Sequence, residues 1–155
     1  EFEGTISKFG DSTGTYMDEI ISYGPSVYDF VTVYEATAIG QIENAAGKYG
    51  ELRIYYPPAT SLSDHPFCVL DADWVAPERA EAGRMFLDFL TDKEMQELAM
   101  MEYGFRPVIP LDRPGSPFLQ DTDNGVELDI PPQVEVPPGN VLNTLLEFWA
   151  RNIQR

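Results

Sequence analysis

The sequence predicts an α/β fold, in which a mostly parallel sheet is flanked by helices. Three short runs of branched and aromatic apolar residues, at 28–34, 52–56 and 67–70, have the composition of buried strands. Amphipathic stretches with helical spacing separate or follow these runs. Strands that alternate with helices along a chain are typical of parallel sheets, because each parallel crossover needs a helix-length connection.

Two helices are expected in the first third of the chain. The first follows the polar residues 11–14, carries apolar residues at i, i+4 spacing and stops at Gly24. The second occupies residues 36–46, after the first predicted strand. The strand at 52–56 is ended by two prolines, which cannot continue the ladder of a sheet.

Two further helices are expected in the middle of the chain. Pro77 is well placed for the first turn of a helix that runs to about Leu90. Residues 91–94 form a capping-box pattern, which predicts another helix that stops at Gly104.

The last third of the chain changes in character. Residues 106–139 are rich in proline and turn formers, which predicts an extended segment draped over the domain. A last helix is expected from about Asn140. Its apolar residues form one wide stripe that must bury against another surface: Leu142, Leu145, Leu146, Trp149 and Ile153.

Composition narrows the classes of partner and chemistry. The chain has 26 acidic and 10 basic residues, a net charge of -16, so it repels phosphate backbones and nucleic acid is not an expected partner. One Cys and one His cannot form a Cys/His zinc cluster. Because we find no catalytic triad, metal cluster or phosphate motif, we expect no enzyme activity and no cofactor. The chain opens without Met or a signal-like segment, which we interpret as a piece of a longer protein.

Tyr34 and Glu35 are the first candidate ligand-binding residues. They stand at the carboxyl end of the predicted strand at 28–34, and open α/β sheets bind ligands outside the carboxyl ends of their strands. The alternative is that Tyr34 covers the core and Glu35 simply opens the next helix.

The start of the first helix is the second candidate. Ser12 and Thr13 present hydroxyl groups beside free backbone N–H groups, which suits a carboxylate or an oxyanion. An ordinary N-cap is the alternative. Sequence spacing leaves open whether this polar end and Tyr34 face one cleft.

His65 and Cys68 lie close in sequence but do not indicate a catalytic pair. The apolar neighbours of Cys68 predict a buried and inert thiol. His65 is expected to shape its loop through hydrogen bonds. Asp71 and Asp73 alone make neither a calcium loop nor an acid/base pair.

Six short motifs follow one another at residues 28–35, 54–57, 63–67, 69–72, 86–90 and 103–107. In this order they resemble the carboxyl-terminal part of an extracellular solute-binding protein of an ABC transporter. More narrowly, the chain is similar to the sulfate/molybdate-like type II class, which includes members fused to von Willebrand factor A domains. The resemblance covers roughly residues 9–153.

The resemblance implies a type II periplasmic-binding-protein-like fold, a two-lobed clamp of which this chain is a fragment. It places residues 1–50 at the end of the second lobe and residues 51–72 at the hinge crossover. It assigns residues 73–155 to helices and a proline-rich segment that return to the first lobe.

The resemblance also implies ligand contacts. In oxyanion binders of this class, a helix start and a Tyr at the following strand end touch the ligand, and Asp11, Ser12, Thr13 and Tyr34 match those positions. Glu35 is adjacent, and its negative charge argues against sulfate or molybdate. A polar or cationic solute, or a cleft re-used for protein contact, stays open.

The implied function is the extracytoplasmic solute-binding component of an ABC transporter, in the periplasm or at the cell surface. It would capture a small polar solute by hinge closure and deliver it to the permease. The alternative is a sensor or protein-interaction module with the same fold. Because the amino-terminal part of the clamp is not in these residues, we expect a homodimer or a swapped assembly.

Overall fold

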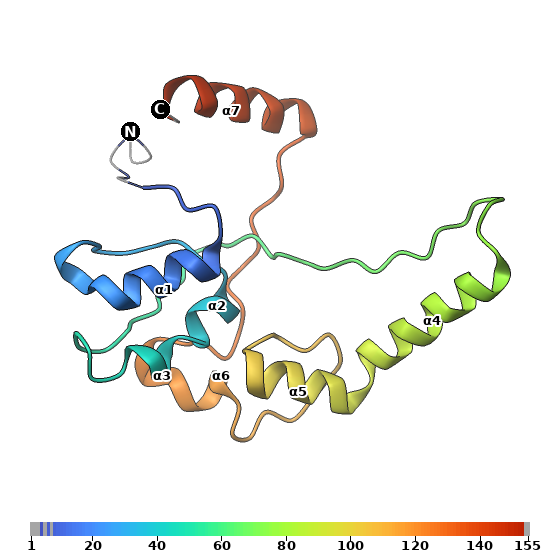
Figure 1. Cartoon of the computed structure of the whole chain (residues 1–155), viewed down its shortest axis with the longest axis horizontal. Helices are drawn as coiled ribbons and strands as arrows, with labels where there is room; N and C mark the ends of the chain where they lie inside the picture. Colours follow the sequence, from blue (N-terminus) through green and yellow to red (C-terminus); the bar gives the residue numbers. More distant parts are fainter. Residues whose placement is uncertain (1–3, 5, 7, 154–155) are drawn as a thin grey trace.

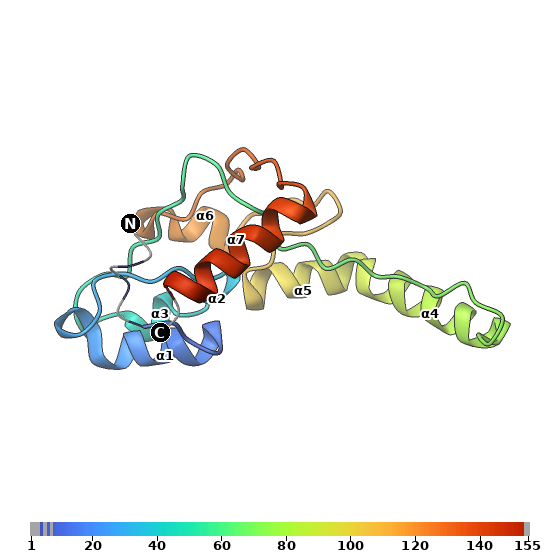
Figure 2. The ribbon, with the colours of Figure 1, turned by 90° about the horizontal axis from the view of Figure 1, so that it is seen from above.

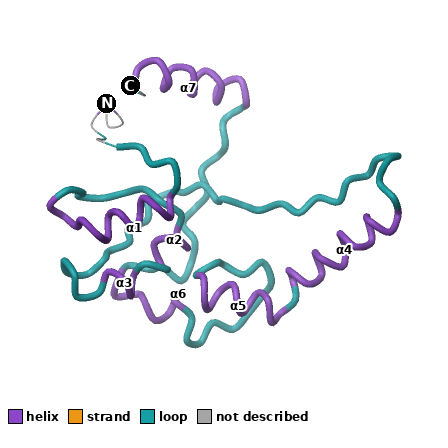
Figure 3. The backbone as a smooth tube through the Cα atoms, in the orientation of Figure 1, coloured by secondary structure: helices purple, strands orange, loops and turns teal. Residues whose placement is uncertain are grey.

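The computed structural model describes residues 4, 6 and 8–153, and its regular elements are helices joined by long loops (Figure 1). The structure is 49% helix and has no β-strand among the described residues. The prediction of an α/β fold with a mostly parallel sheet, and with it the type II clamp fragment, is therefore wrong. The three runs predicted as strands are loops (Figure 3).

The physical reason is that these runs find no neighbour with which to form a ladder. The described residues contain an isolated bridge, between Thr60 and Gln133, which lies outside the three runs. There the Thr60 N–H donates to the carbonyl of Pro132 at 2.9 Å, and the Val134 N–H donates to the Thr60 carbonyl at 2.8 Å. Apolar and branched composition favours a strand only where a partner strand is within reach.

The first predicted helix is confirmed as α1 (Thr13–Tyr23), and Ser12 is its N-cap. The Thr15 N–H donates to the Ser12 hydroxyl at 3.5 Å, and a short 3-10 helix, η2 (Gly24–Ser26), follows. The predicted helix at 36–46 is instead two short helices, α2 (Glu35–Ile39) and α3 (Ile42–Ala45).

The next two predicted helices are confirmed. They are α4 (Pro77–Thr91), with Pro77 in its first turn, and α5 (Lys93–Tyr103). The Asp92 side chain caps α5 by accepting from the Glu94 N–H at 2.9 Å. Gly104 ends α5 in the left-handed conformation with φ 66°.

The proline-rich segment contains α6 (Pro117–Gln120) and the 3-10 helix η3 (Asp121–Asn124), so it is more structured than the sequence predicts. The last helix, α7 (Gly139–Asn152), is confirmed. None of the helices in the described part of the chain is long and apolar enough to cross a membrane.

The buried core is small and consists of two clusters. One contains Ile39, Met100, Phe118 and Val126, and the other contains Met17, Ile21 and Ala45. We call residues 13–60 and 92–128, which hold both clusters, the body. Residues 61–91, which include α4, project away from it in two perpendicular views, and we call them the arm (Figures 1 and 2).

One glycine permits a close approach inside the body. Gly125 has φ 91°, and a Cβ there would lie 2.2 Å from the Ile54 carbonyl oxygen. The Ile54 N–H donates to the Asn124 carbonyl at 2.7 Å. The segment around Ile54 is therefore held against the end of η3, which brings the neighbouring Tyr56 toward the site described below.

The molecule exposes more surface than a compact monomer of its mass. Its accessible surface is 11884 Å² for 17.4 kDa. A folded monomer of this mass exposes about 7,900 Å². The excess of about 4,000 Å² is consistent with an arm and a terminal helix that lie outside the body.

Candidate functional site

The site is centred on Glu35, the first residue of α2. Tyr34 is the N-cap residue of α2, with extended φ and ψ of -68° and 146° and no capping hydrogen bond from its side chain. Tyr34 is 58% exposed, whereas the Glu35 side chain is mostly covered. The two candidate residues therefore differ, since Tyr34 faces the surface and Glu35 faces the protein.

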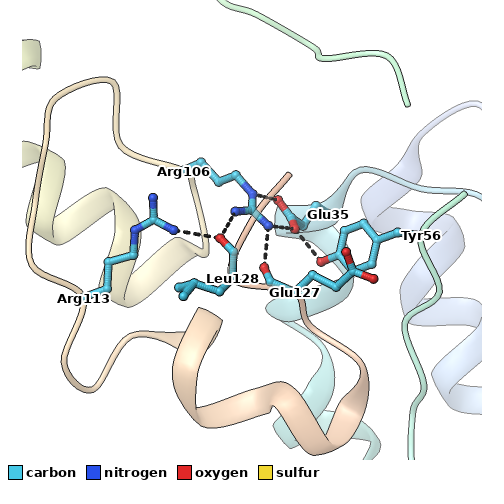
Figure 4. A network of polar contacts seen from close by, with 6 residues as sticks. All are labelled: Glu35, Tyr56, Arg106, Arg113, Glu127 and Leu128. Carbon is cyan, nitrogen blue, oxygen red and sulfur yellow. Dashed lines mark hydrogen bonds and ion pairs between the residues drawn. The ribbon is translucent and has the colours of Figure 1, made fainter. Parts of the chain in front are cut away.

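Arg106 reaches Glu35 because of the way α5 ends. After the left-handed Gly104, the Phe105 N–H donates to the Ala99 carbonyl at 3.1 Å, and the chain leaves the helix toward α2. The Arg106 Nε then donates to Glu35 Oε2 at 2.7 Å, and its Nη2 donates to Glu35 Oε1 at 2.7 Å (Figure 4). This bidentate geometry is the strong form of a carboxylate–guanidinium pair.

Tyr56 completes the ties to the carboxylate. Its hydroxyl donates to Glu35 Oε1. Burial, followed by the hydrogen bond and the charge of Glu35, raises the pKa of Tyr56 to about 12. Because its pKa is raised, Tyr56 is protonated at neutral pH and donates a hydrogen bond to the carboxylate. We call Glu35, Tyr56 and Arg106 the polar tie.

The Arg106 guanidinium also donates to two backbone carbonyl groups. Its Nη2 donates to the Glu127 carbonyl at 2.7 Å, and its Nη1 donates to the Leu128 carbonyl at 2.8 Å. The Arg113 Nη1 donates to the same Leu128 carbonyl at 2.8 Å (Figure 4). The Arg106 guanidinium carbon also lies 4.5 Å from the ring centroid of the fully buried Phe118, a cation–π contact.

Burial alone would lower the pKa of Arg106, but the hydrogen bond and charge of Glu35 outweigh it and raise the pKa above its ordinary value. Arg106 therefore stays charged and cancels the charge of Glu35. Three donors of the protein share the two carboxylate oxygens, so the carboxylate of Glu35 is engaged mainly by Arg106 and Tyr56. The polar tie joins segments that are far apart in sequence, and its first effect is structural.

The other predicted site residues lie at the start of α1. Ser12 acts as an ordinary N-cap, and Asp11 beside it is exposed. α1 packs against α2, and the first turn of α1 lies next to α2 in both views (Figures 1 and 2). The structure thus brings the end of α1 that carries Ser12 and Thr13 to the same side of the body as α2, while Glu35 itself turns to Arg106.

Sequence reasoning missed two members of the polar tie. Tyr56 and Arg106 belong to motifs that the sequence singled out, but neither was expected to touch Glu35. A signal was present for Arg106, because it is one of only 10 basic residues and lies two positions after the predicted helix stop at Gly104. The sequence did not identify Glu35 as the partner of Arg106, because the two residues are 71 positions apart.

The remaining candidates do not form a site. Cys68 is exposed, so the prediction of a buried thiol is wrong. The His65 ring lies edge-on to Phe105 at 6.4 Å between centroids. Among the described residues, no group of three or more His, Cys, Asp or Glu side chains is placed to hold a metal ion.

Two shallow hollows lie in the arm. The first has a volume of about 210 Å³ and is lined mainly by apolar residues of 67–83, and the second lies along α4 between Pro77 and Met85. Neither hollow touches Tyr34 or the polar tie.

Comparison of the chain with family models, with curated proteins and with solved structures gave no match.

Proposed function

We propose that this chain is part of the extracytoplasmic solute-binding component of an ABC transporter, and that Tyr34 and the first turn of α1 contact a small polar solute. The six ordered motifs of the sequence support this class of function. The observation that carries the site is the neutralisation of Glu35 by Arg106. It offsets the charge of Glu35, which would otherwise repel an anionic solute from Tyr34.

The proposed contacts need no chemistry beyond hydrogen bonding. The Tyr34 phenol and the Ser12 hydroxyl can each donate or accept, and the backbone N–H groups in the first turn of α1 donate. Such a set of donors fits a carboxylate or an oxyanion, which meets a Glu35 that is paired with Arg106 rather than a free carboxylate. No bond is made or broken, so the chain is not proposed to be an enzyme.

Tyr34 is open to solvent, so in this proposal a second protein surface completes the site. Closure of the two surfaces follows if the solute binds more tightly to the closed arrangement than to the open one. Reopening would then release the solute to the permease.

The test is a titration of the ¹⁵N-labelled chain with sulfate, molybdate, glycine and glucose, each followed by amide chemical shifts. We expect at least one of these to shift the amides of Thr15, Tyr34 and Glu35. Replacement of Tyr34 by alanine should weaken that binding by about tenfold, the equivalent of one lost hydrogen bond.

Tyr103→Ala is the matched control, because Tyr103 is as exposed as Tyr34 but lies at the end of α5. It should leave the titration unchanged. If none of the four compounds shifts these amides, or if both variants weaken binding equally, Tyr34 is not a solute contact.

A protein-interaction module is the second candidate function, favoured by the exposed excess of about 4,000 Å². A module of this kind should show slow hydrogen exchange in α4 and α7 only when its partner is bound. The solute titration separates the two candidates, since an interaction module has no reason to bind any of the four compounds at Tyr34.

A further inference from the structure

Residues 124 and 125 form the only Asn-Gly pair in the sequence. In such a pair the backbone nitrogen of the glycine can attack the side-chain amide of the asparagine readily, because glycine has no Cβ to hinder the approach. The other four asparagines are each followed by a residue with a side chain: Asn44, Asn140, Asn143 and Asn152. By sequence alone, Asn124 is therefore the residue most prone to deamidation.

The structure holds both groups that this reaction needs. The Gly125 N–H donates to the Thr122 carbonyl at 3.0 Å, so the attacking nitrogen is fixed in the turn that ends η3. The partly buried Asn124 side chain donates from Nδ2 to the Leu52 carbonyl at 2.9 Å. Attack requires loss of the Gly125 proton and rotation of the Asn124 amide, and each hydrogen bond opposes one of these steps.

Further contacts hold the Asn-Gly pair against the segment around Ile54. The Ile54 N–H donates to the Asn124 carbonyl at 2.7 Å, and the Arg53 Nη1 donates to the Asp123 carbonyl. Val126 is 3% exposed in a core cluster, and Ile54 packs against the same cluster. The pair is thus freed only when this part of the body opens.

The products of deamidation do not fit this place in the fold. An aspartate at position 124 has no N–H for the Leu52 carbonyl and brings a carboxylate against it. Burial and the charge of Glu43 already raise the pKa of Asp121 in η3, so a further negative charge there is unfavourable. An isoaspartate adds a methylene group to the backbone directly before Gly125, where even a Cβ would overlap the Ile54 carbonyl oxygen.

We propose that Asn124 and Gly125 form a deamidation site that the folded body protects, and that deamidation irreversibly lowers the stability of chains whose body has opened. The Gly125 nitrogen loses its proton and bonds to the Asn124 Cγ, the bond from Cγ to Nδ2 breaks, and ammonia leaves with the proton. Water then opens the resulting succinimide ring at either carbonyl, which gives aspartate or isoaspartate. The reaction needs only water, and it does not depend on whether Tyr34 binds a solute.

The test compares the rate of deamidation in the folded chain and in the chain unfolded by urea, at the same mildly alkaline pH. Peptide mapping by mass spectrometry follows the replacement of NH₂ by OH at each asparagine. We expect Asn124 to react about a hundredfold more slowly in the folded chain, because only a minor open population can react. Equal rates in the two conditions, or a faster reaction at another asparagine in urea, would overturn the proposal.

A pair of variants tests whether opening of the body controls the rate. Met100→Ala weakens the core of the body and should speed the reaction at Asn124 by about tenfold or more. Met85→Ala, on the exposed face of α4, is the control and should leave the rate unchanged. Urea below the unfolding transition should also speed the reaction in the unsubstituted chain. A rate that stays constant as urea rises to the transition would contradict the proposal.

Asn124→Asp produces one product directly. It should shift the equilibrium between folded and unfolded chain toward the unfolded state by about tenfold, measured by urea unfolding. Asn143→Asp adds the same charge at an exposed position of α7 and should change this equilibrium little. Equal stability of Asn124→Asp and the unsubstituted chain would show that deamidation does not impair the fold.

Discussion

The helices α4 and α5 follow one another directly, and both are amphipathic, but only α5 has a core to join. α5 places Met100, 1% exposed, in the cluster with Ile39 and Phe118. α4 is longer and buries none of its residues. Amphipathicity thus makes burial favourable, but burial occurs only where a distant part of the chain returns to cover the helix.

The contacts of the two regions differ in range. In the body, Glu35 and Arg106 meet across 71 residues of sequence. In the arm, the ring contact between Phe67 and Phe86 joins the two sides of one local turn, at 5.9 Å between centroids. The arm therefore has side-chain contacts but no cluster of buried residues, which is why most of its apolar surface remains exposed.

The largest expected contrast is between two methionines. Met100→Ala should lower the free energy of unfolding by about 3 kcal/mol, because it leaves a cavity in the core of the body. Met85→Ala, on the exposed face of α4, should lower it by less than about 0.5 kcal/mol. Urea unfolding followed by circular dichroism measures both, since the tryptophans, Trp74 and Trp149, lie outside the body. Equal effects would mean that the arm is packed in solution.

The next contrast is between two salt bridges. Arg106→Ala leaves the mostly covered Glu35 without its bidentate partner and should cost about 2 kcal/mol of stability. Arg84→Ala removes an exposed pair with Glu81 on α4 and should cost less than about 0.5 kcal/mol. The same unfolding experiment compares them. A loss as small for Arg106 as for Arg84 would show that the polar tie does not hold the body together.

The third expected effect is a pH dependence. The folded state raises the pKa of Tyr56 from 10.0 to about 12, so it favours the protonated phenol. This stabilisation is fully present below pH 10 and is lost as the pH rises from 10 to 12, because the unfolded chain releases the proton first. Tyr56→Phe should therefore flatten the fall in the urea midpoint over this range.

Tyr55→Phe is the control for the pH experiment, because Tyr55 is exposed and adjacent in sequence. It should keep the full pH dependence of the wild-type chain. An identical pH profile for both variants would place the titration elsewhere in the protein.

The sequence predicted helices well and sheets badly. Caps and stops located α1, α4 and α5, because Ser12, Pro77, Asp92 and Gly104 act within one turn of the helix that they bound. The apolar stripe located α7. The run at 28–34 has the composition of a strand, but composition did not reveal that no other segment pairs with it. The candidate site was half predicted, since Tyr34 and Glu35 were named but Tyr56 and Arg106 were not.

What the sequence determined by itself is therefore local: the ends of the long helices, the acidic surface and the apolar stripe of α7. These follow from hydrogen bonds between residues a few positions apart and from the count of charges. The tertiary structure alone decided that the strand-like runs stay loops and that Arg106 neutralises Glu35. Both depend on which distant segments come into contact, and the residues of one segment do not by themselves indicate which other segment will pack against them.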